Sequence, residues 1–469
     1  MIKLFLEKHK EFIIYFTAAL AIIIFYPKWT VDDSAILFRY ADNFRNHSQL
    51  NWNVGEYFEG YTGVLLLLIL IVSPLKYIIT AYAIGALSYL FGGYVLYKYT
   101  RNRAVRILVM ISYLSAPALL THAFSGLETM LFIFLFLLAL YAFREGKDKL
   151  IYLSLILISL ARPEGVLFSL LILASVRKKN ISVIYLIFIG AYLIFKFYYY
   201  GNVLPNSFYH KGLAPQQFKS NLIEFSEYFL LYLSVPLIII NYGYRKRLIK
   251  IQWWIPVMFA AVIMYYLNCH LAMNYSYRFY IQMFPLVLIM MASVQSLPNK
   301  LVLPLIILQL SFYAYSLNKE LNYINDERMI NNDMVQTANF IDANYTKNKK
   351  LCVYTDAGYI PFLTKMETLD LNGLLNKEIT ENEYKNNHSN YDLQTRCTLT
   401  FIYKLNYLYS FNPDVLVISS NYSDSPNTGV FTQLMLSDSR FRQFEFIKKY
   451  GSTLSSGQKY YQFIYEKIL

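Results

Sequence analysis

Two adjacent carboxylates, Asp32 and Asp33, stand where the first apolar run of the chain gives way to a polar stretch. A carboxylate in such a place is suited to take a proton from a hydroxyl group, which is the task of a general base. We interpret the stretch Thr30 to Thr62 as a catalytic loop, in which either aspartate can be the base. The alternative is an ordinary solvated loop whose carboxylates face water.

Cationic side chains in other parts of the chain are suited to hold an anionic group such as a phosphate. The candidates are Arg39, Arg162, His210, Lys211 and Arg278. Because a planar guanidinium matches a phosphate with two parallel hydrogen bonds and lysine acts more as a point charge, Arg162 and Arg278 rank above Lys211. The structural alternatives are a local pair of Arg162 with Glu164 and a membrane-interface anchor at Arg278.

Further polar and aromatic residues lie at the ends of apolar runs, where ionisable groups inside a helical bundle are costly and therefore indicate function. For Glu128 the alternative is a carboxylate favoured by the dipole of a helix N-terminus. The full set that we predict to bind substrate or donor phosphate is Arg39, Tyr40, Glu59, Tyr61, Glu128, Arg162, Glu164, Asn206, Tyr209, His210, Lys211 and Arg278.

The sequence assigns no metal site. His210 has no second ligand at the spacing of a zinc site. A hard cation held by Asp32, Asp33 or Glu128 would suit oxygen ligands, so a divalent cation stays open as a cofactor. No other cofactor is indicated.

The composition is that of a protein with many membrane-spanning segments. Of the 469 residues 56% are hydrophobic, and the mean hydropathy is +0.33. The net charge of +13 comes from short basic clusters between apolar runs, which is typical of cytoplasmic loops and does not indicate nucleic-acid binding. The three cysteines exclude a disulfide scaffold, and they leave open either a Cys352 to Cys397 bridge or unpaired thiols.

The lysines before the first apolar run place the N-terminus inside, so residues 28–78 form the first external loop. The run 63–73 has only about eleven residues, fewer than the roughly twenty that a span needs, and we predict that it dips into the bilayer and returns. If it crossed fully, the basic clusters at residues 98–106, 177–179 and 245–247 would all become external. With the short run inside the outer leaflet, every polar motif named above falls on the external side.

We therefore predict a polytopic α-helical membrane protein with about eleven crossings, the N-terminus inside and the C-terminus outside. The predicted spans are residues 12–26, 80–97, 107–120, 130–143, 151–160, 166–176, 181–198, 229–242, 253–268, 280–296 and 301–317. Residues 1–317 then form the transmembrane domain. Residues 318–469, which are polar and Asn-rich with short apolar runs, form an extracytoplasmic α/β domain. Its predicted strands are 351–355, 413–419, 444–449 and 460–465, with helices over 331–345 and 399–409.

Several motifs, in this order, resemble those of the C-type glycosyltransferase superfamily, GT-C. They are DDSAILFRYADNF and NVGEYFEGYTG in the first loop, SGLETMLF from Ser125, ARPEG from Ala161, LPNSFYHKG from Leu204, YRFYIQMFPL from Tyr277, and DAGYIPFLTKMETLDLNGLLN from Asp356. The likeness extends over nearly the whole chain. It is greatest to the branch that holds the mycobacterial terminal arabinofuranosyltransferases.

The resemblance implies a GT-C bundle and an inverting transferase that takes a sugar from a polyprenyl-phosphate donor, with Asp32 or Asp33 as the base. It implies an active site on the periplasmic face of the cytoplasmic (inner) membrane, with membrane lipids and a glycan or glycolipid as partners. The composition differs from that of the Ala-rich mycobacterial proteins, so the donor sugar does not carry over. We expect a surface glycan, lipopolysaccharide or glycoprotein as acceptor.

Two other classes of function fit a polytopic chain with embedded ionisable residues. A flippase or transporter of lipid-linked glycans predicts internal repeats and helices broken near the midplane, and the sequence shows neither. A glycan-assembly protein that has lost its chemistry would not need both carboxylates. The glycosyltransferase is the leading hypothesis.

Overall fold

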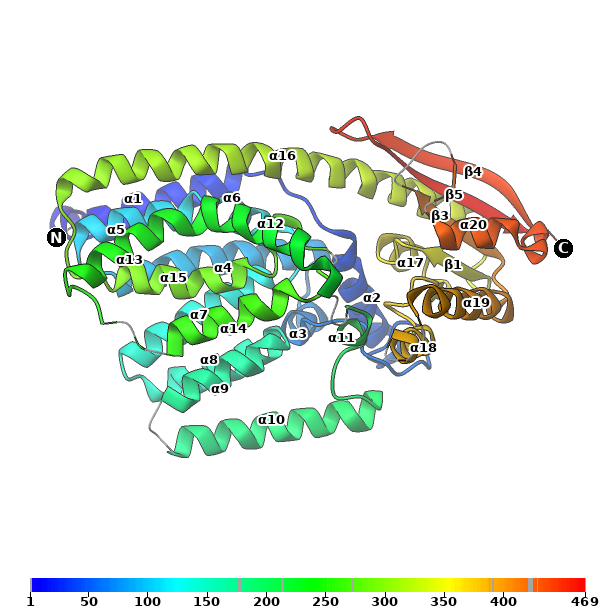
Figure 1. The fold of residues 1–469 in the computed structure, drawn as a ribbon, viewed down its shortest axis with the longest axis horizontal. Coiled ribbons are helices and arrows are strands. Elements are labelled where there is room, and N and C mark those ends of the chain that lie inside the picture. Colours follow the sequence, from blue (N-terminus) through cyan, green and yellow to red (C-terminus); the bar gives the residue numbers. More distant parts are fainter. Residues whose placement is uncertain are drawn as a thin grey trace.

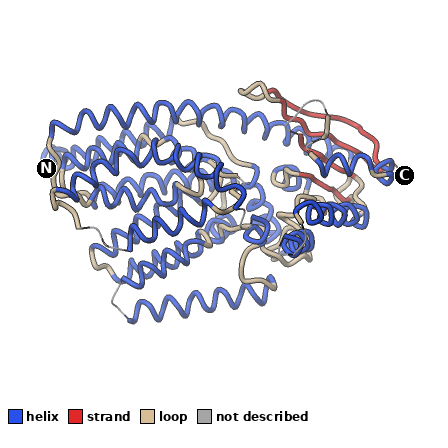
Figure 2. Tube along the Cα trace, in the orientation of Figure 1, coloured by secondary structure: helices blue, strands red, loops and turns tan. Residues whose placement is uncertain are grey.

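The computed structural model describes residues 2–468 apart from residues 176–178, 212–214, 251, 253, 272, 388, 390–391, 421–424 and 428. Most of the described residues are helical, and the five-stranded sheet that they include lies at the end opposite the N-terminus (Figures 1 and 2). The short helices α2 (Asp32–His47) and α11 (Asn206–Lys211) lie between the helical bundle and the part with the sheet (Figure 1). The candidate site is built at this junction.

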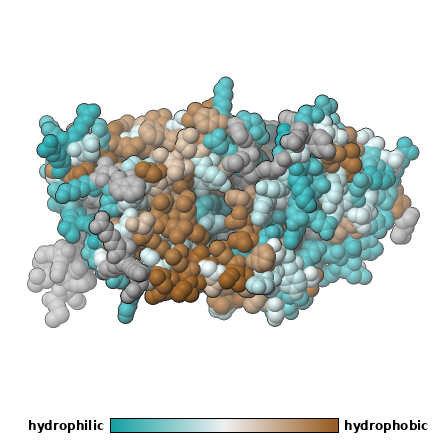
Figure 3. Space-filling view, turned by 60° about the horizontal axis from the view of Figure 1, so that its bottom comes forward, coloured by the Kyte–Doolittle hydropathy of each residue, from teal (hydrophilic) through white to brown (hydrophobic). Residues whose placement is uncertain are grey.

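The helices of the bundle agree closely with the apolar runs of the sequence. They are α1 (Ile2–Phe25), α4 (Tyr77–Tyr99), α5 (Arg103–Leu114), α6 (Pro117–Phe124), α7 (Thr129–Arg144), α8 (Asp148–Ala161), α9 (Glu164–Ser175), α10 (Lys179–Tyr200), α12 (Phe218–Tyr228), α13 (Ser234–Arg245), α14 (Trp254–Leu267) and α15 (Phe284–Ala292). A π-helical turn, Phe229–Leu233, joins α12 to α13. Hydrophobic residues gather on the surface of the bundle, whereas the end with the sheet is mostly hydrophilic (Figure 3).

Among the described residues, four helical segments are long and apolar enough to cross a membrane: Tyr77–Tyr99, Ser182–Tyr200, Phe218–Arg245 and Asn299–Asn344. The bent pair of α5 and α6, whose axes differ by 47°, would make a fifth. Shorter apolar helices of 10–17 residues include α7, α9 and α14. The predicted helical architecture with several apolar helices of spanning length is thus found, while the eleven crossings and their orientation stay a prediction.

One predicted span is divided in the structure, and the short run before the second span forms a short helix as predicted. Ala116 and Pro117 divide the predicted span 107–120 into α5 and α6, because proline removes a backbone donor and suits only the start of a new helix. The run 63–73 forms α3 (Val64–Val72), a helix of nine residues. At 1.5 Å per residue it is about 13 Å long, which is less than half the thickness of a bilayer core. The predicted shortness of this segment is confirmed.

The predicted boundary at residue 317 falls inside a continuous helix. The 46 residues of α16 (Asn299–Asn344) run from the bundle to the sheet along most of the length of the molecule (Figure 1). Composition changes from apolar to polar near Asn318, but no proline or glycine follows there to end the helix. One rigid element therefore joins the two parts of the chain.

The sheet has the strand order β2-β1-β3-β5-β4. Its strands are β1 (Lys350–Tyr354), β2 (Glu367–Asp370), β3 (Val415–Ser420), β4 (Phe444–Thr453) and β5 (Lys459–Lys467). The strands β2, β1 and β3 are parallel, and β5 pairs antiparallel with β3 and β4. The helices α17 (Tyr359–Thr364), α18 (Lys377–Asn387), α19 (Leu393–Phe411) and α20 (Val430–Ser437) connect them. Four of the five strands are confirmed predictions, and β2 was missed because it is only four residues long.

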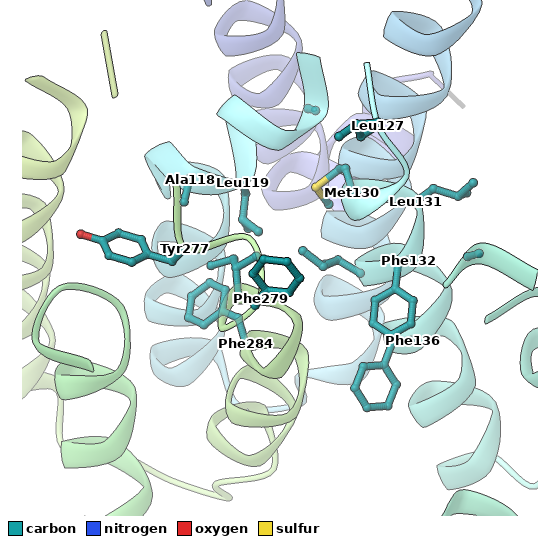
Figure 4. Close-up of a cluster of buried hydrophobic side chains, with 14 of the residues drawn as sticks. Ala118, Leu119, Leu127, Met130, Leu131, Phe132, Phe136, Tyr277, Phe279 and Phe284 are labelled. Atoms are coloured by element: carbon teal, nitrogen blue, oxygen red, sulfur yellow. The ribbon is translucent and has the colours of Figure 1, made fainter. Parts of the chain in front are cut away.

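Burial of apolar side chains stabilises both parts. The bundle core extends from α1 to α16, and Figure 4 shows a section of it around Phe132 and Phe136 of α7 and Leu119 of α6. A second core under the sheet contains Cys352 of β1. Cys352 is buried, Cys397 of α19 is exposed, and both thiols are free. Of the two alternatives that the sequence left open, the structure therefore contains unpaired thiols and no Cys352–Cys397 disulfide.

Candidate active site

The two adjacent aspartates begin α2 and have different environments. Asp32 is buried, and its carboxylate accepts hydrogen bonds from the backbone N–H groups of Gly358 (2.8 Å) and Tyr359 (2.7 Å). Burial raises the pKa of Asp32 well above its ordinary value, the neighbouring Asp356 carboxylate raises that pKa further, and the two backbone hydrogen bonds oppose the rise. Asp32 thus joins the first loop to the turn after β1.

Asp33 faces an open space. Its side chain is 21% exposed, and its Oδ2 lies 3.8 Å from Nη1 of Arg278. It lines a small cavity of about 40 Å³ together with Gly60, Tyr61, Thr62 and other residues. Of the two aspartates that the sequence left equivalent, Asp33 is the one with access to a substrate.

Three further charged residues, Glu128, Arg162 and Glu164, continue from Asp33 and Arg278 into the bundle. Oε1 of Glu128 lies 2.8 Å from Nη1 of Arg162 and 3.5 Å from Nη2 of Arg278, so one carboxylate oxygen holds both guanidinium groups. Glu164 accepts from Nη2 of Arg162 at 3.2 Å and from the Tyr266 hydroxyl at 3.0 Å. The predicted Arg162–Glu164 pair exists, and Glu128 extends it towards Asp33.

The two arginines keep unused donors. Both side chains are buried, and Nε of each has no hydrogen-bond partner among the described residues. Buried polar atoms in proteins almost always have a partner, so two orphan N–H groups on arginines that share the Glu128 carboxylate call for an explanation. An anion between the guanidinium groups would satisfy them.

A large cavity of about 400 Å³ begins at these arginines. Its wall is mainly apolar and is built by α9, α14, the loop before α11 and residues near Cys269. The lining residues are Thr62, Arg162, Pro163, Glu164, Leu167, Phe168, Leu204, Pro205, Ser207, Phe208, Ala261, Val262, Tyr265, Tyr266, Cys269, His270, Leu271, Arg278 and Phe279. Thr62, Ser207 and Arg278 also line the small cavity, so the two spaces adjoin at Arg278.

The loop before α11 is fixed by Asn206. Its backbone N–H donates to the carbonyl of Glu59 at 2.7 Å, and its side chain donates to Leu374 O (2.8 Å) and Thr380 Oγ1 (3.1 Å). Asn206 therefore ties this wall of the cavity to both the first loop and the end with the sheet. The neighbouring Tyr209 packs edge-on against Tyr384, with ring centroids 5.5 Å apart.

The side chains of His210 and Lys211 lie outside the described part of the chain, so the structure gives no place to these two predicted phosphate ligands.

Arg39 holds the backbone together and does not bind a phosphate as predicted. Its guanidinium donates to the carbonyls of Trp52 (2.9 Å), Pro361 (2.6 Å) and Met366 (2.7 Å), and to side-chain oxygens of Asn53 and Thr368. These bonds use all of its N–H groups. The residue is buried where the first loop meets the turn around α17, and no N–H group is left for a phosphate. The sequence could not reveal this set of partners, because three of the five, Pro361, Met366 and Thr368, lie more than 300 positions away in the chain.

Two further predicted residues, Tyr40 and Tyr61, support the loop through their hydroxyl groups. The Tyr40 hydroxyl donates to Phe58 O at 3.1 Å and accepts from the Gly60 N–H at 3.0 Å. Tyr61 lines the small cavity, and its hydroxyl bonds to that of Tyr200 at 2.9 Å.

Glu59 forms a buried ion pair with Lys196 of α10 at 2.6 Å. Burial raises the pKa of Glu59 to about 7, although Lys196 opposes this rise. The sequence analysis missed Lys196. A single ammonium group within a long apolar run is the feature by which it could have been found.

The divalent cation that the sequence allows stays a prediction. Within the described ranges, no three His, Cys, Asp or Glu side chains come together as potential metal ligands.

Comparisons with known proteins point to the fold. A family model described as a domain of unknown function, DUF8728, matches residues 322–465. No curated protein matches the sequence. A crystal structure of ArnT from Cupriavidus metallidurans bound to undecaprenyl phosphate is similar, with 11% sequence identity and a TM-score of 0.57. The superposed region covers 97% of this chain and 98% of the ArnT chain. The apo crystal structure of the same protein has 12% identity, a TM-score of 0.56 and the same coverage.

At this identity the likeness shows the fold alone. The chain shares the helical membrane-protein architecture of ArnT along nearly its whole length.

Proposed function

We propose that the chain is an inverting membrane glycosyltransferase of the GT-C type, which moves a sugar from a polyprenyl-phosphate donor to a hydroxyl group of an acceptor. The observation that carries the proposal is the mainly apolar cavity of about 400 Å³ that ends at two buried arginines, with the accessible carboxylate of Asp33 beside Arg278. An isoprenoid chain needs an apolar cavity, and its phosphate needs cations at one end of that cavity. The structural neighbour crystallised with undecaprenyl phosphate supports the same class of lipid.

In this mechanism Asp33 is the base. It takes the proton of the acceptor hydroxyl while the hydroxyl oxygen forms a bond to the anomeric carbon of the sugar. The bond from that carbon to the phosphate oxygen breaks, and its electron pair leaves with the phosphate. Arg278 and Arg162 stabilise the negative charge of the leaving group with their free N–H donors. Asp32 positions Asp33 through its bonds to the turn after β1.

The finer predictions from the sequence remain part of the proposal. They are an orientation with Asp33 on the periplasmic face of the inner membrane, about eleven crossings, an extracytoplasmic domain over residues 318–469, and a surface glycan, lipopolysaccharide or glycoprotein as acceptor. A likeness to the arabinofuranosyltransferase branch also stays a prediction. The comparisons support polyprenyl-phosphate lipids as a partner and give no support to arabinose as the sugar.

A test follows from the difference between a transferase and a flippase. Purified protein is mixed with polyprenyl-phosphate sugars and a membrane fraction that supplies acceptors, and the lipids are analysed by mass spectrometry. A transferase converts the lipid-linked sugar into free polyprenyl phosphate, and the Asp33→Asn variant does not. A flippase would leave the lipid unchanged in this assay and move it across the bilayer of a reconstituted vesicle, and that result would refute the proposal.

A further inference from the structure

The segment that leads into Arg278 has an unusual backbone. Met273, Ser276 and Tyr277 have positive φ angles of 64°, 49° and 57°. This left-handed region is uncommon for residues other than glycine, and a run of such residues persists only where the surroundings hold it. The side chains that hold this segment therefore decide where the Arg278 guanidinium lies.

Ser276 is held on both its side chain and its backbone. Its hydroxyl donates to Oε2 of Glu320, a buried residue of α16, and the same oxygen accepts from the Thr121 hydroxyl of α6 at 2.9 Å. The carbonyl of Ser276 lies 3.1 Å from Nε2 of the buried His122, which donates to it. Two side chains from two helices, Glu320 and His122, thus fix a residue that lies two positions before Arg278, and Thr121 holds Glu320 in turn.

Helix packing alone does not account for Glu320. It is buried, it has no ion pair within 4 Å among the described residues, and its Oε2 accepts hydrogen bonds from the hydroxyl groups of Ser276 and Thr121. A buried carboxyl group without an ionic partner is costly, and an apolar side chain would pack between α16 and α6 at lower cost. The carboxyl oxygen is useful here as an acceptor for two hydroxyl groups at one point.

We propose that Glu320 is a positioning residue for the donor phosphate. By holding Ser276 in its left-handed conformation, it sets the Arg278 guanidinium between Glu128 (3.5 Å) and Asp33 (3.8 Å), where its free Nε can reach a phosphate. This assignment rests on the proposed function, because it assumes that Arg278 binds phosphate. It adds a residue of α16, the helix that also reaches the sheet, to those that control the site.

The test separates the phosphate from its lipid chain. The affinities of the purified full chain for undecaprenyl phosphate and for undecaprenol are measured by native mass spectrometry, and the ratio of the two gives the contribution of the phosphate. Glu320→Ala is expected to lower this ratio by about tenfold, because a charge-assisted contact is lost when the guanidinium moves. Its affinity for undecaprenol should stay within about twofold of the wild type, since the apolar wall is unchanged.

Two further variants keep the proposal testable if Glu320→Ala does not fold. Glu320→Gln keeps an oxygen that accepts from both hydroxyl groups, so it should restore the wild-type ratio. Ser276→Ala removes the donor and should lower the ratio as much as Glu320→Ala, and the double variant should be no worse than either single one because both break the same contact. As a control, Gln309→Ala removes another buried polar side chain of α16, one that donates to Leu231 O at 3.2 Å, and should leave the ratio unchanged.

The experiment gives different results if the proposed function is wrong and if only the role of Glu320 is wrong. If the wild-type chain binds undecaprenol as tightly as undecaprenyl phosphate, the proposed function fails and the role of Glu320 fails with it. If the wild type prefers the phosphate, Arg278→Ala removes that preference, and the folded Glu320→Ala or Ser276→Ala variant keeps it, then only the role of Glu320 is refuted.

Discussion

Asp32 and Gly358 are separated by 326 positions in the sequence, yet the backbone N–H of Gly358 donates to the Asp32 carboxylate at 2.8 Å. Gly358 has no room for a side chain, because a methyl group there would overlap both the backbone oxygen and the carboxylate of Asp32. This contact ties the first loop to the end with the sheet. It leaves Asp33, the next residue, free to face Arg278.

The first prediction concerns this contact. Gly358→Ala should lower the free energy of unfolding by about 2 kcal/mol, because the added methyl group forces the turn after β1 away from α2. Thermal unfolding of the purified protein in detergent measures the change. Gly190→Ala is the matched control, since a methyl group at that position of α10 meets open space. Equal stability of the two variants would show that the contact does not constrain the loop.

The second prediction concerns the apolar cavity. Ala261 lines the cavity, and its neighbour Ala260 on the same helix is exposed and does not. Ala261→Trp should weaken the binding of undecaprenyl phosphate by about tenfold or more, because the indole occupies space that the isoprenoid needs. Ala260→Trp should bind like the wild type. If both variants bind equally well, the lipid lies elsewhere.

The third prediction uses the thiols of the chain as probes. Cys269 lines the cavity, whereas Cys397 is exposed on α19. Undecaprenyl phosphate should slow the reaction of Cys269 with a small methanethiosulfonate reagent and leave the reaction of Cys397 unchanged, because only the first thiol is covered by the lipid. Peptide mass spectrometry measures both reactions in one sample. Protection of neither thiol at a saturating lipid concentration would contradict the assignment of the cavity.

The fourth prediction concerns pH. Burial raises the pKa of Glu59 from 4.5 to about 7. Between pH 4.5 and about 7 the folded chain therefore holds a proton on Glu59 that the unfolded chain has lost. The stabilising contribution is therefore complete below about pH 4.5 and is lost as the pH rises through about 7. Across this interval the loss is on the order of 3 kcal/mol. Glu59→Gln should remove this part of the pH dependence of thermal stability.

The exposed Glu381 of α18 provides a matched control for this test. The thermal stability of the Glu381→Gln variant should depend on pH as strongly as that of the wild type. If Glu59→Gln and the wild type lose stability in parallel between pH 5 and 8, the buried Glu59 carboxyl group is not the cause.

The sequence predicts those parts of the site that carry a local signal. Asp33, Glu128, Arg162 and Arg278 are ionisable residues at the ends of apolar runs, and the structure brings all four together. Local signals could not separate Asp32 from Asp33, because the difference lies in the backbone N–H groups of residues 358 and 359, which only the fold brings close.

The residues that sequence analysis missed or misassigned have partners far away in the chain. Lys196 and Glu320 lie within helices and look like isolated polar residues until Glu59 and Ser276 are placed beside them. Arg39 resembles a phosphate ligand until its carbonyl partners are known. The boundary at residue 317 was predicted from a change in polarity, which marks where a helix leaves an apolar environment and not where it ends.

The central claim, a sugar transfer that uses Asp33 as its base, is tested most directly in cells that lack the chain and carry either the wild type or a variant. Mass spectrometry of their surface glycans should show one sugar residue missing without the chain, restored by the wild type, and still missing with Asp33→Asn, although that variant binds undecaprenyl phosphate normally. A surface glycan fully restored by Asp33→Asn would contradict the account.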